Sequence, residues 1–436
     1  MRRIVQLLAL VAVLAVVPAL LPPYYVTLLN YIGISALVAV GLVLLTGVGG
    51  LTSFGQAAFV GVGAYTTAVL TTSASLPGWV AWAGASPWLA LAAGLVITGL
   101  IALLLGSLTL KLSGHYLPLG TIAWGISLYF LFGTLDFLGA QSGISGLPPI
   151  SIAGISLDEG GEIYYLIWAF VLAAVVTTHN LLDSREGRAI RALKGGVVMA
   201  EAMGVDTSRS RIVIFVIAAL HACAAGWLYA HMQRLVNPSP FGLHHGIEYL
   251  FMAVVGGAGY VWGAVIGAGL VTLLNQWLQD WLPKLFGHAG NFEIIVFGLL
   301  LLLILHRARE GMWPALLRLF RVKAAPKVIV DSAAALPRRT LPARGEVILE
   351  VKDVTRRFGG LVANKDMNFS MKAGEILALI GPNGAGKSTM FNQISGVDTP
   401  TSGEIVFAGQ VVTGRDSREI ARSEEHTSEL QSRQVI

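Results

Sequence analysis

Long apolar runs fill the first 306 residues of the chain. A helix needs about 20 mainly apolar residues to cross the hydrocarbon core of a bilayer. Charged residues make up only 13% of the chain, against about 25% in an average soluble domain. The sequence therefore predicts an α-helical polytopic membrane domain over 1–306. The runs that approach the required length predict about eight spans, at 4–21, 27–46, 54–72, 88–110, 115–137, 163–179, 211–231 and 291–306.

The first run is expected to remain as an uncut anchor. It follows Arg2 and Arg3, as the core of a signal peptide would. Pro22 and Pro23 come after it without a clear small-residue cleavage site. A cleaved signal peptide is the alternative.

The loops between the runs differ in charge. Loop 73–87 has no charged residue and loop 138–162 has only acidic ones, whereas loop 183–211 contains Arg185, Arg188, Arg191, Lys194, Arg209 and Arg211. Lys and Arg concentrate in short cytoplasmic loops, so we expect 183–211 and the N-terminus to be cytoplasmic and 138–162 to be external. A basic surplus in short loops of a membrane protein usually reports orientation, so despite the formal net charge of +5 we expect no nucleic-acid binding.

The composition changes after residue 306. Residues 307–344 are rich in Arg, Lys, Pro and Ala, which indicates an exposed linker. A second, soluble domain is expected over 345–421. VILEV at 347–351 and EILALI at 375–380 are predicted to be strands, the second apolar enough to be buried in an α/β domain.

GPNGAGKST at 381–389 follows the second predicted strand directly. Glycines and a lysine in this spacing before a helix are typical of a phosphate-binding loop, because the backbone N–H groups face the phosphates and the helix adds its positive end. Lys387 is expected to reach the β- and γ-phosphates and Ser388 to ligate Mg²⁺. The predicted binding residues are Gly381, Asn383, Gly384, Ala385, Gly386, Lys387, Ser388 and Thr389.

Segment 247–274 decides on which side of the membrane the rest of the chain lies. If it crossed once, the helix ending near His306 would deliver the nucleotide loop outside the cell. Its centre, GGAGYVWGAVIGA at 256–268, is rich enough in glycine to break a helix. We therefore expect a broken or re-entrant helical hairpin of two half-helices. The alternative is one long helix with a small-residue packing face, in which case another span is miscounted.

The sequence around the nucleotide loop is similar to a known family. VTRRFGGLVANKDMNFSMKAGEILALIGPNGAGKSTMFNQISGVDTPTSGEIVFAGQ, residues 354–410, resembles the opening of an ABC transporter ATPase. The resemblance implies an α/β P-loop domain that binds ATP and Mg²⁺, with Phe358 stacked on adenine. The alternative for Phe358 is a core aromatic.

Other parts of that family are missing from the printed sequence. After Gln410 there is no LSGGQ-like signature, no apolar strand ending in Asp-Glu and no later switch histidine. Residues 345–421 are therefore expected to be an incomplete ATPase domain that does not hydrolyse ATP as printed. RSEEHTSELQS at 422–432 matches the translation of a sequencing adapter, so 422–436 is expected to be a non-native tail. A polar, disordered native tail is the alternative.

The membrane domain carries a second resemblance. LLTGVGGLTSFGQAAFVGVGAY at 44–65, SGHYLPLGTIAW at 113–124, loop 185–206 and the segment at 256–268 are similar to the permease of branched-chain amino acid ABC importers. Tyr260 and Ala264 depart from that family, which more often has Thr and Pro there. The resemblance implies ATP-driven import of branched-chain or related amino acids. Relatives also carry urea, short amides and aromatic acids, so these stay open as substrates.

The resemblance also implies an assembly of several subunits. One such permease supplies half of a membrane pathway, so we expect a second permease, a second ABC ATPase and an external solute-binding protein. The location implied is the plasma (inner) membrane of a bacterium or archaeon, with the ATPase domain in the cytoplasm and lipid around the spans.

The loop at 185–206 is expected to couple the permease to the ATPase. By the resemblance, the coupling residues are Arg188, Glu201, Ala202 and Gly204. Ala189, Ala192 and Leu193 form a small apolar stripe that a docking helix would use. A positively charged topological anchor is the alternative.

Few ionisable residues fall inside the apolar runs. His221 lies in the middle of a run and is a candidate for the substrate pathway, with a neutral histidine bonded between helices as the alternative. Asp136, Glu248, His115 and His231 lie near segment ends, where we expect solvent to reach them. Cys223, the only cysteine, is expected to be a buried spacer.

Two other classes of function fit parts of the sequence. An ABC exporter also joins a membrane domain to an ATPase, but exporters typically have long cytoplasmic helical extensions and the loops here are too short for them. A nucleotide-regulated channel or secondary carrier would sense ATP without using it to drive transport. A catalytic glutamate after an apolar strand would favour the pump.

Overall fold

The computed structural model describes residues 12–72, 86–110, 116–152, 154–286, 296, 298–299, 302–303, 306–308, 310–319 and 342–421. Internal contacts divide the chain into two compact units, residues 1–194 with 208–323, and residues 195–207 with 324–436. The tail predicted at 422–436 lies outside the described residues, as do residues 4–11 of the predicted span at 4–21 and most of the predicted span at 291–306. The predicted domain boundaries stay predictions.

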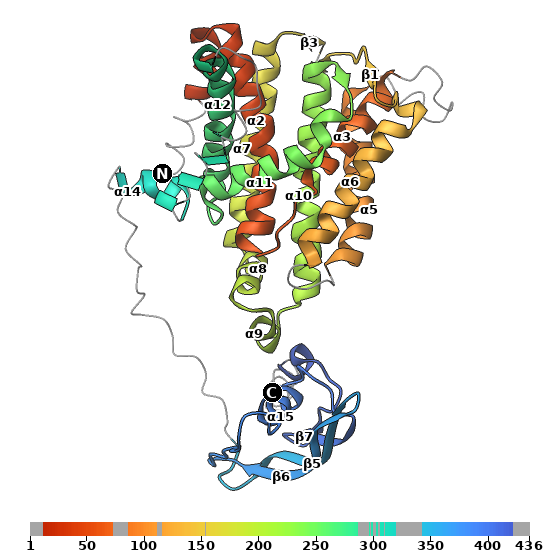
Figure 1. Cartoon of the computed structure of the whole chain (residues 1–436), viewed down its shortest axis with the longest axis vertical. Coiled ribbons are helices and arrows are strands. Elements are labelled where there is room, and N and C mark those ends of the chain that lie inside the picture. Colours follow the sequence, from red (N-terminus) through yellow and green to blue (C-terminus); the bar gives the residue numbers. More distant parts are fainter. Residues whose placement is uncertain are drawn as a thin grey trace, which may run out of the picture. The chain divides into compact units, whose positions relative to one another are not determined.

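The first unit is a bundle of helices (Figure 1). Helix α2 continues into a π-helix, η1, and short 3₁₀ turns η2 and η3 lie between later helices. The elements are α2 (Pro23–Leu42), η1 (Val43–Val48), α3 (Gln56–Thr72), α5 (Pro87–Thr109), α6 (Tyr116–Thr134), η2 (Asp136–Leu138), α7 (Gly160–Asp183), α8 (Arg185–Gly195), α10 (Thr207–Gln233), η3 (Ser239–Phe241), α11 (Leu243–Gly257), α12 (Val261–Phe286) and α14 (Met312–Leu319).

Six helical segments in the described part of the chain are long and apolar enough to cross a membrane. Five of them coincide with predicted spans: α2 with η1, α5, α6, α7 and α10. The sixth is α12, which the sequence analysis did not predict as a span. The prediction at 54–72 corresponds to α3, a helix of only 17 residues. A multi-pass helical membrane domain is therefore confirmed, but the count of eight spans is not.

The predicted break in segment 247–274 occurs between α11 and α12, at residues 258–260. The prediction of two half-helices was wrong for the second one. Helix α11 has 15 residues, about 22 Å of helix, whereas the 26 residues of α12 extend about 39 Å. Past residue 274, apolar pairs alternate with the polar pairs Asn275–Gln276 and Gln279–Asp280, so each turn keeps apolar residues and the helix continues.

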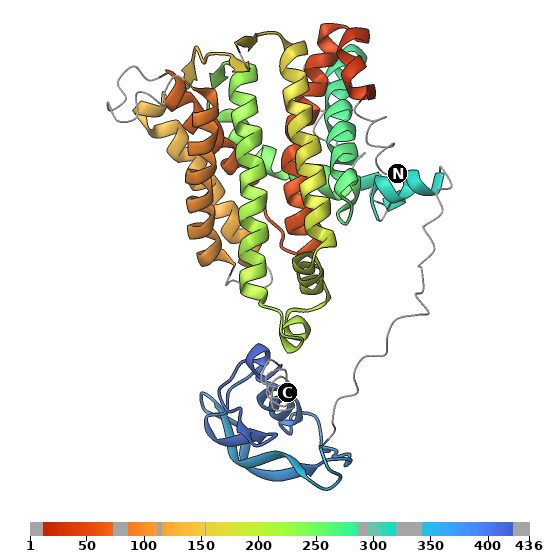
Figure 2. The same cartoon turned by 180° about the vertical axis from the view of Figure 1, so that it is seen from behind.

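Helix α2 with η1 forms the centre of the unit, because 83% of its apolar window is buried. In α5 and α6 only 28% is buried, and α5 turns Val96, Leu100 and Leu104 outward, as expected for a lipid-facing surface. Seen from behind, α7 (yellow) and α10 (light green) run along the long axis of the unit (Figure 2).

Small residues let α3 and α10 pack backbone against backbone. A Cβ atom added to Gly226 of α10 would lie 2.0 Å from the carbonyl oxygen of Val60 in α3, and one added to Gly63 would lie 2.3 Å from the carbonyl oxygen of Cys223. Close approach through small residues is the usual way that helices associate in lipid. Cys223 is fully buried in this contact, which confirms the prediction of a buried spacer.

Short strands and α8 lie at opposite ends of the first unit (Figure 1). Strand β1 (Ile144–Ser145) pairs with β4 (Leu235–Val236), and β2 (Ile150–Ile152) pairs with β3 (Ile155–Leu157), all antiparallel. Helix α7 starts just after β3, with a capping box at its first turn, and α8 follows its last residue. Because α7 is 24 residues long, the loops predicted to face opposite sides of the membrane lie at its opposite ends.

The second unit contains an antiparallel sheet in the order β6-β5-β7-β8. The strands are β5 (Val347–Phe358), β6 (Leu361–Lys372), β7 (Ser402–Phe407) and β8 (Gln410–Val411), and helix α15 (Lys387–Ile394) follows the nucleotide loop. In this register Leu349 of β5 faces Met371 of β6 and Phe407 of β7. The buried core of the unit comprises Leu349, Val351, Val354, Met390, Ile405 and Val412.

The prediction of a buried strand at 375–380 was wrong. The segment has no strand pairing among the described residues; Ile376 is 98% exposed and Ile380 is 90% exposed. An apolar segment becomes a buried strand only when other strands pair with it. The sheet of this unit has the order β6-β5-β7-β8, and none of these strands pairs with 375–380. The sheet seen is antiparallel, so the predicted α/β architecture of this domain is not confirmed.

Candidate functional site: the nucleotide loop and its links to the membrane domain

Two glycines in left-handed conformations shape the loop at 381–386. Gly384 has φ +87° and Gly386 has φ +81°, values that side chains other than glycine rarely adopt. Gly386 also lies against β6, because an added Cβ atom would be 2.3 Å from the carbonyl oxygen of Ala363. Gly381 has no left-handed φ. The loop therefore depends on two of its three predicted glycines for its turn.

Lys387 closes the loop that precedes it. Its Nζ donates hydrogen bonds to the carbonyl oxygens of Gly381 at 2.8 Å and Pro382 at 2.7 Å. It is also the first residue of α15, whose N-cap Gly386 has no side-chain hydrogen bond, so the first N–H groups of the helix remain available. An ammonium group and free N–H groups at one helix start are donors that fit a polyphosphate.

The remaining predicted binding residues lie on the same exposed surface. Asn383 and Ala385 are exposed in the turn, Ser388 is exposed on the first turn of α15, and Thr389 is half-buried beside it. The arrangement fits Mg²⁺ held by the Ser388 hydroxyl next to phosphates. The roles of these residues stay predictions.

Phe358 lies at the end of β5, beside the hairpin turn to β6, and is 48% exposed. The alternative of a core aromatic was therefore wrong. The Arg356 guanidinium carbon lies 4.5 Å from the centre of the Phe358 ring, and the Arg356 Nη2 also pairs with Asp398 at 2.6 Å. The paired guanidinium holds one face of the ring, so a purine would stack on the other face. Arg356 was not predicted as a site residue. The only indication of it in the sequence is that it lies two residues before Phe358.

The coupling residues at 201–204 belong to the second unit. Helix α9 (Val197–Ala202) and the turn after it group with 324–436. Glu201 accepts a hydrogen bond from the Thr207 hydroxyl at 2.5 Å, which fixes the turn. Gly204 has φ +79°, so the chain needs glycine there, and Ala202 is exposed.

An ion pair inside the second unit joins this segment to the ATPase portion. Asp206 Oδ2 lies 2.5 Å from Arg418 Nη1, and about two thirds of each side chain is buried. Val198, Met199 and Met203 are exposed large apolar residues on the same segment. The coupling role expected for this segment stays a prediction.

Of the apolar stripe predicted on α8, Ala189 and Ala192 are half-buried and Leu193 is buried; a docking role for the stripe stays a prediction. Leu193 and its neighbour Ile190 are buried in the core of the membrane domain. Arg188, also predicted to couple, is exposed on the same helix. Lys194 at the end of α8 donates from Nζ to the carbonyl oxygen of Gly47 at 2.9 Å, so α8 is tied to η1.

The ionisable residues of the membrane domain differ in exposure. Asp136 is exposed as expected. Glu248, with 15% of its side chain exposed, lies 3.7 Å from His244 Nε2, and His231 is buried with its Nδ1 2.9 Å from the carbonyl oxygen of Pro148. The expectation that solvent reaches these positions was wrong for His231, which is covered by the distant Pro148 segment. Glu248 stays partly exposed, and His115 lies outside the described residues.

His221 remains a candidate for the pathway. It is half-buried in α10, and its Nδ1 has no hydrogen-bond partner among the described residues. Groups of three His, Cys, Asp or Glu that could hold a metal ion do not occur in the described part of the chain.

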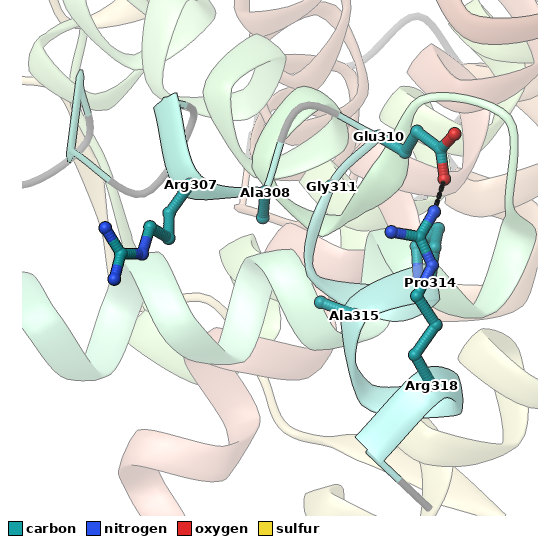
Figure 3. A pocket seen from close by; sticks show the side chains of 7 residues that line it. All are labelled: Arg307, Ala308, Glu310, Gly311, Pro314, Ala315 and Arg318. Atoms are coloured by element: carbon teal, nitrogen blue, oxygen red, sulfur yellow. Dashed lines mark hydrogen bonds and ion pairs between the residues drawn. The ribbon is translucent and has the colours of Figure 1, made fainter. Parts of the chain in front are cut away.

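A pocket of about 270 Å³ lies beside α14 in the first unit (Figure 3). Arg318 and Glu310 form an ion pair at its edge. The lining residues are Arg307, Ala308, Glu310, Gly311, Pro314, Ala315 and Arg318. None of them is a predicted site residue, and the one carboxylate in the lining is already paired with a guanidinium.

Comparison with known proteins separates the same two parts. Residues 24–305 match the family described as branched-chain amino acid transport system / permease component, and residues 364–434 match the ABC transporter family. One relative is the high-affinity branched-chain amino acid transport system permease protein LivM of Salmonella typhimurium, 24% identical over 52% of this chain and 57% of the relative. The chain thus spans little more than half the length of that relative.

The ATPase portion resembles several ATP-binding proteins. It is 44% identical to the high-affinity branched-chain amino acid transport ATP-binding protein BraF of Pseudomonas aeruginosa, over 17% of this chain and 29% of the relative. It is 48% identical to the probable multidrug ABC transporter ATP-binding protein YbhF of Escherichia coli, over 15% of this chain and 11% of the relative. The match at 24–305 covers more than half of the 436 residues. This chain is therefore a member of the permease family of branched-chain amino acid transport systems, fused to part of an ABC ATPase that implies ATP binding.

Proposed function

We propose that this chain is one permease subunit of an ATP-driven importer for branched-chain or related amino acids. The observation that carries the proposal is the presence, in one chain, of a permease-family membrane domain and a phosphate-binding loop of the ABC type. The relative LivM is named as a branched-chain amino acid permease, which supports this substrate class over urea, short amides and aromatic acids. Import, rather than export, is supported by the same family.

The residues of the nucleotide loop would hold ATP and Mg²⁺. Lys387 and the first N–H groups of α15 compensate the phosphate charge, Ser388 ligates the metal ion, and the free face of Phe358 stacks on the purine. When bound, ATP supplies the free energy of its hydrolysis.

The segment at 195–207 would transmit motion between the two parts. Asp206 and Arg418 join it to the ATPase portion. The α8 helix next to it holds η1 through Lys194 and Gly47. A displacement of the ATPase portion would thus act on the central helix of the permease.

A complete transporter would contain further subunits. We infer a second permease, a second ABC ATPase and an external solute-binding protein in the plasma membrane of a bacterium or archaeon, with the nucleotide loop in the cytoplasm. The solute-binding protein would select the amino acid. The eight-span topology and an α/β form of the ATPase domain belong to the same proposal.

The proposal is tested by uptake into proteoliposomes that contain the assembled transporter and its solute-binding protein. ATP-dependent accumulation of leucine above its external concentration is expected, with urea and benzoate accumulated far less. Accumulation driven only by an ion gradient would favour a secondary carrier, and equilibration without accumulation would favour a channel. Either result would overturn the proposed pump.

Single cysteines test the proposed orientation. In a Cys223→Ala background, Ser142→Cys and Glu186→Cys place a thiol at exposed positions near opposite ends of α7. An impermeant maleimide added to intact cells is expected to label position 142 and not position 186, because Lys and Arg concentrate in cytoplasmic loops. The opposite pattern would reverse the assigned orientation, and labelling after cell lysis provides the control for reactivity.

A charge exchange tests the proposed transmission path. Arg418→Glu is expected to lower coupled uptake about fivefold to tenfold, because it sets two carboxylates against each other at a partly buried contact. The double variant Asp206→Arg with Arg418→Glu should recover most of the loss. Arg415→Glu, the same change three residues away, serves as the matched control. No recovery in the double variant would contradict a role for this pair.

A further inference from the structure

The chain between α2 and α3 is non-helical backbone inside the membrane domain. Residues 49–55 connect the end of η1 to the start of α3, and Leu51, Ser53 and Gly55 in this connection are buried. Non-helical backbone at this depth occurs where it is covered by protein or lines a pathway. In transporters, discontinuous helices of this kind direct their N-terminal ends at anionic groups of the solute.

Three elements meet at residues 53–56. The N–H of Phe54 donates to the Thr121 hydroxyl of α6 at 3.2 Å. A Cβ atom added to Gly55 would lie 2.3 Å from the Trp124 indole, and one added to Gly246 of α11 would lie 2.1 Å from the Phe54 carbonyl oxygen. The turn is thus held between α6 and α11 with no room for larger residues at either glycine.

Polar side chains at this junction are buried without partners. Gln56 is 1% exposed, and neither its amide oxygen nor its amide nitrogen has a hydrogen-bond partner among the described residues. The Ser53 hydroxyl and the Trp124 indole N–H are also buried without a described partner, as is the Nδ1 atom of the half-buried His245. Buried polar groups in proteins are nearly always hydrogen-bonded. Four such side chains, from the 49–55 connection, α3, α6 and α11, therefore point to a polar ligand that visits the junction.

The chemistry of the groups selects an anion. The Gln56 amide, the Ser53 hydroxyl and the Trp124 indole all supply donors. Gln56 is also the first residue of the 17-residue α3, whose N-terminal end carries positive partial charge. Segments 49–60, 116–134 and 243–257 contain no Lys or Arg, and their one carboxylate is that of Glu248, which interacts with His245. Neutral donors around a helix start suit a small carboxylate that must bind and then leave.

We propose that the junction formed by Ser53, Gln56, Trp124 and His245, here called the Gln56 site, binds the carboxylate of the solute during passage through the permease. This inference rests on the proposed function, which supplies the amino acid as solute. It adds that the permease itself recognises the carboxylate end. The solute would then contribute the hydrogen bonds that the four side chains lack within the fold.

Binding is tested on the assembled transporter in nanodiscs without solute-binding protein or ATP. The probes are L-leucine, 4-methylvalerate, which keeps the carboxylate and lacks the amine, and isoamylamine, which lacks the carboxylate. Leucine and 4-methylvalerate at millimolar concentration are expected to raise the unfolding temperature of the transporter by about 2 °C or more. Isoamylamine is expected to leave it unchanged. Equal shifts with isoamylamine would overturn the proposal.

Two variants link the effect to the site. Gln56→Met removes both amide atoms at similar volume and is expected to abolish the shift. Ser53→Ala, a smaller change, is expected to reduce it and keeps the test valid if Gln56→Met does not fold. Thr178→Val removes another buried hydroxyl without a described partner, on α7, and should leave the shift intact. A full shift in the folded Gln56→Met variant would refute the site.

Failure of the Gln56 site can be distinguished from failure of the proposed importer function. Wild-type transporter that accumulates leucine with ATP but shows no carboxylate-dependent shift would sink the Gln56 site alone. A shift without ATP-driven accumulation by the wild type would sink the importer and leave a carboxylate site in the membrane domain.

Discussion

Replacing Lys387 with alanine is expected to abolish ATP-driven uptake while the membrane domain stays folded. The Lys387 ammonium closes the nucleotide loop through the carbonyl oxygens of Gly381 and Pro382, and it is the group placed to compensate phosphate charge. Loss of one such electrostatic group typically costs on the order of 10²-fold to 10³-fold in rate. The loop belongs to the second unit, so the packing of the spans should not change.

Uptake of labelled leucine into proteoliposomes checks this expectation. Lys365→Ala removes an exposed lysine from β6 and is the matched control, expected to transport at the wild-type rate. Lys387→Arg keeps the charge but changes the geometry, and is expected to transport poorly, because the two cations are not interchangeable at a shaped site. Wild-type uptake by the alanine variant would rule out the driving role of the loop.

Replacing Gly47 with alanine is expected to destabilise the membrane domain severely. A Cβ atom on Gly47 would lie 1.4 Å from the carbonyl oxygen of Ala258, at the turn between α11 and α12. Backbone atoms cannot move aside as a flexible side chain can, so η1 and the α11–α12 turn must separate. Overpacking costs about 1–3 kcal/mol when side chains absorb it, and we expect about 3 kcal/mol or more here.

The unfolding temperature and the yield of monodisperse transporter in detergent measure the Gly47→Ala effect. Gly161→Ala is the matched control, because a Cβ atom there would meet nothing within 4 Å on a helix of similar length. The control should be neutral or slightly stabilising. A Gly47→Ala variant as stable as the control would show that the two segments are not in backbone contact.

The helices of the membrane domain could be predicted wherever an apolar run alone decides the structure. That condition held for five spans, whose runs have the length that a bilayer requires. It failed for α12, because the predicted run stopped at residue 274 while polar residues such as Asn275 find partners in the bundle; Asn275 Nδ2 lies 3.4 Å from Glu248 Oε1. Hydropathy cannot anticipate such tertiary partners.

The nucleotide loop was predictable because its conformation is local. Gly384 and Gly386 take left-handed φ values, and a short motif specifies them. The structure of the apolar segment at 375–380 could not be predicted in this way, because a strand forms only by pairing with other strands. Ion pairs such as Asp206 with Arg418 join residues more than 200 positions apart, and a single sequence carries no signal for them. The Gln56 site was missed for the same reason: its groups come together only through α6 and α11.

In the π-helix η1, backbone hydrogen bonds join residues five apart instead of four, so the central span contains one residue more than an α-helix of the same length. Its final bonds include Gly49 N–H to Leu44 C=O, a spacing of five residues, at 3.0 Å. One residue of an α-helix corresponds to about 100° of rotation and 1.5 Å of rise. If the register slipped by one residue, the chain at 53–56 would turn by about that angle while the upper part of α2 kept its packing. A one-residue change of hydrogen-bond register in η1 would therefore rotate the chain at 53–56 without unpacking α2.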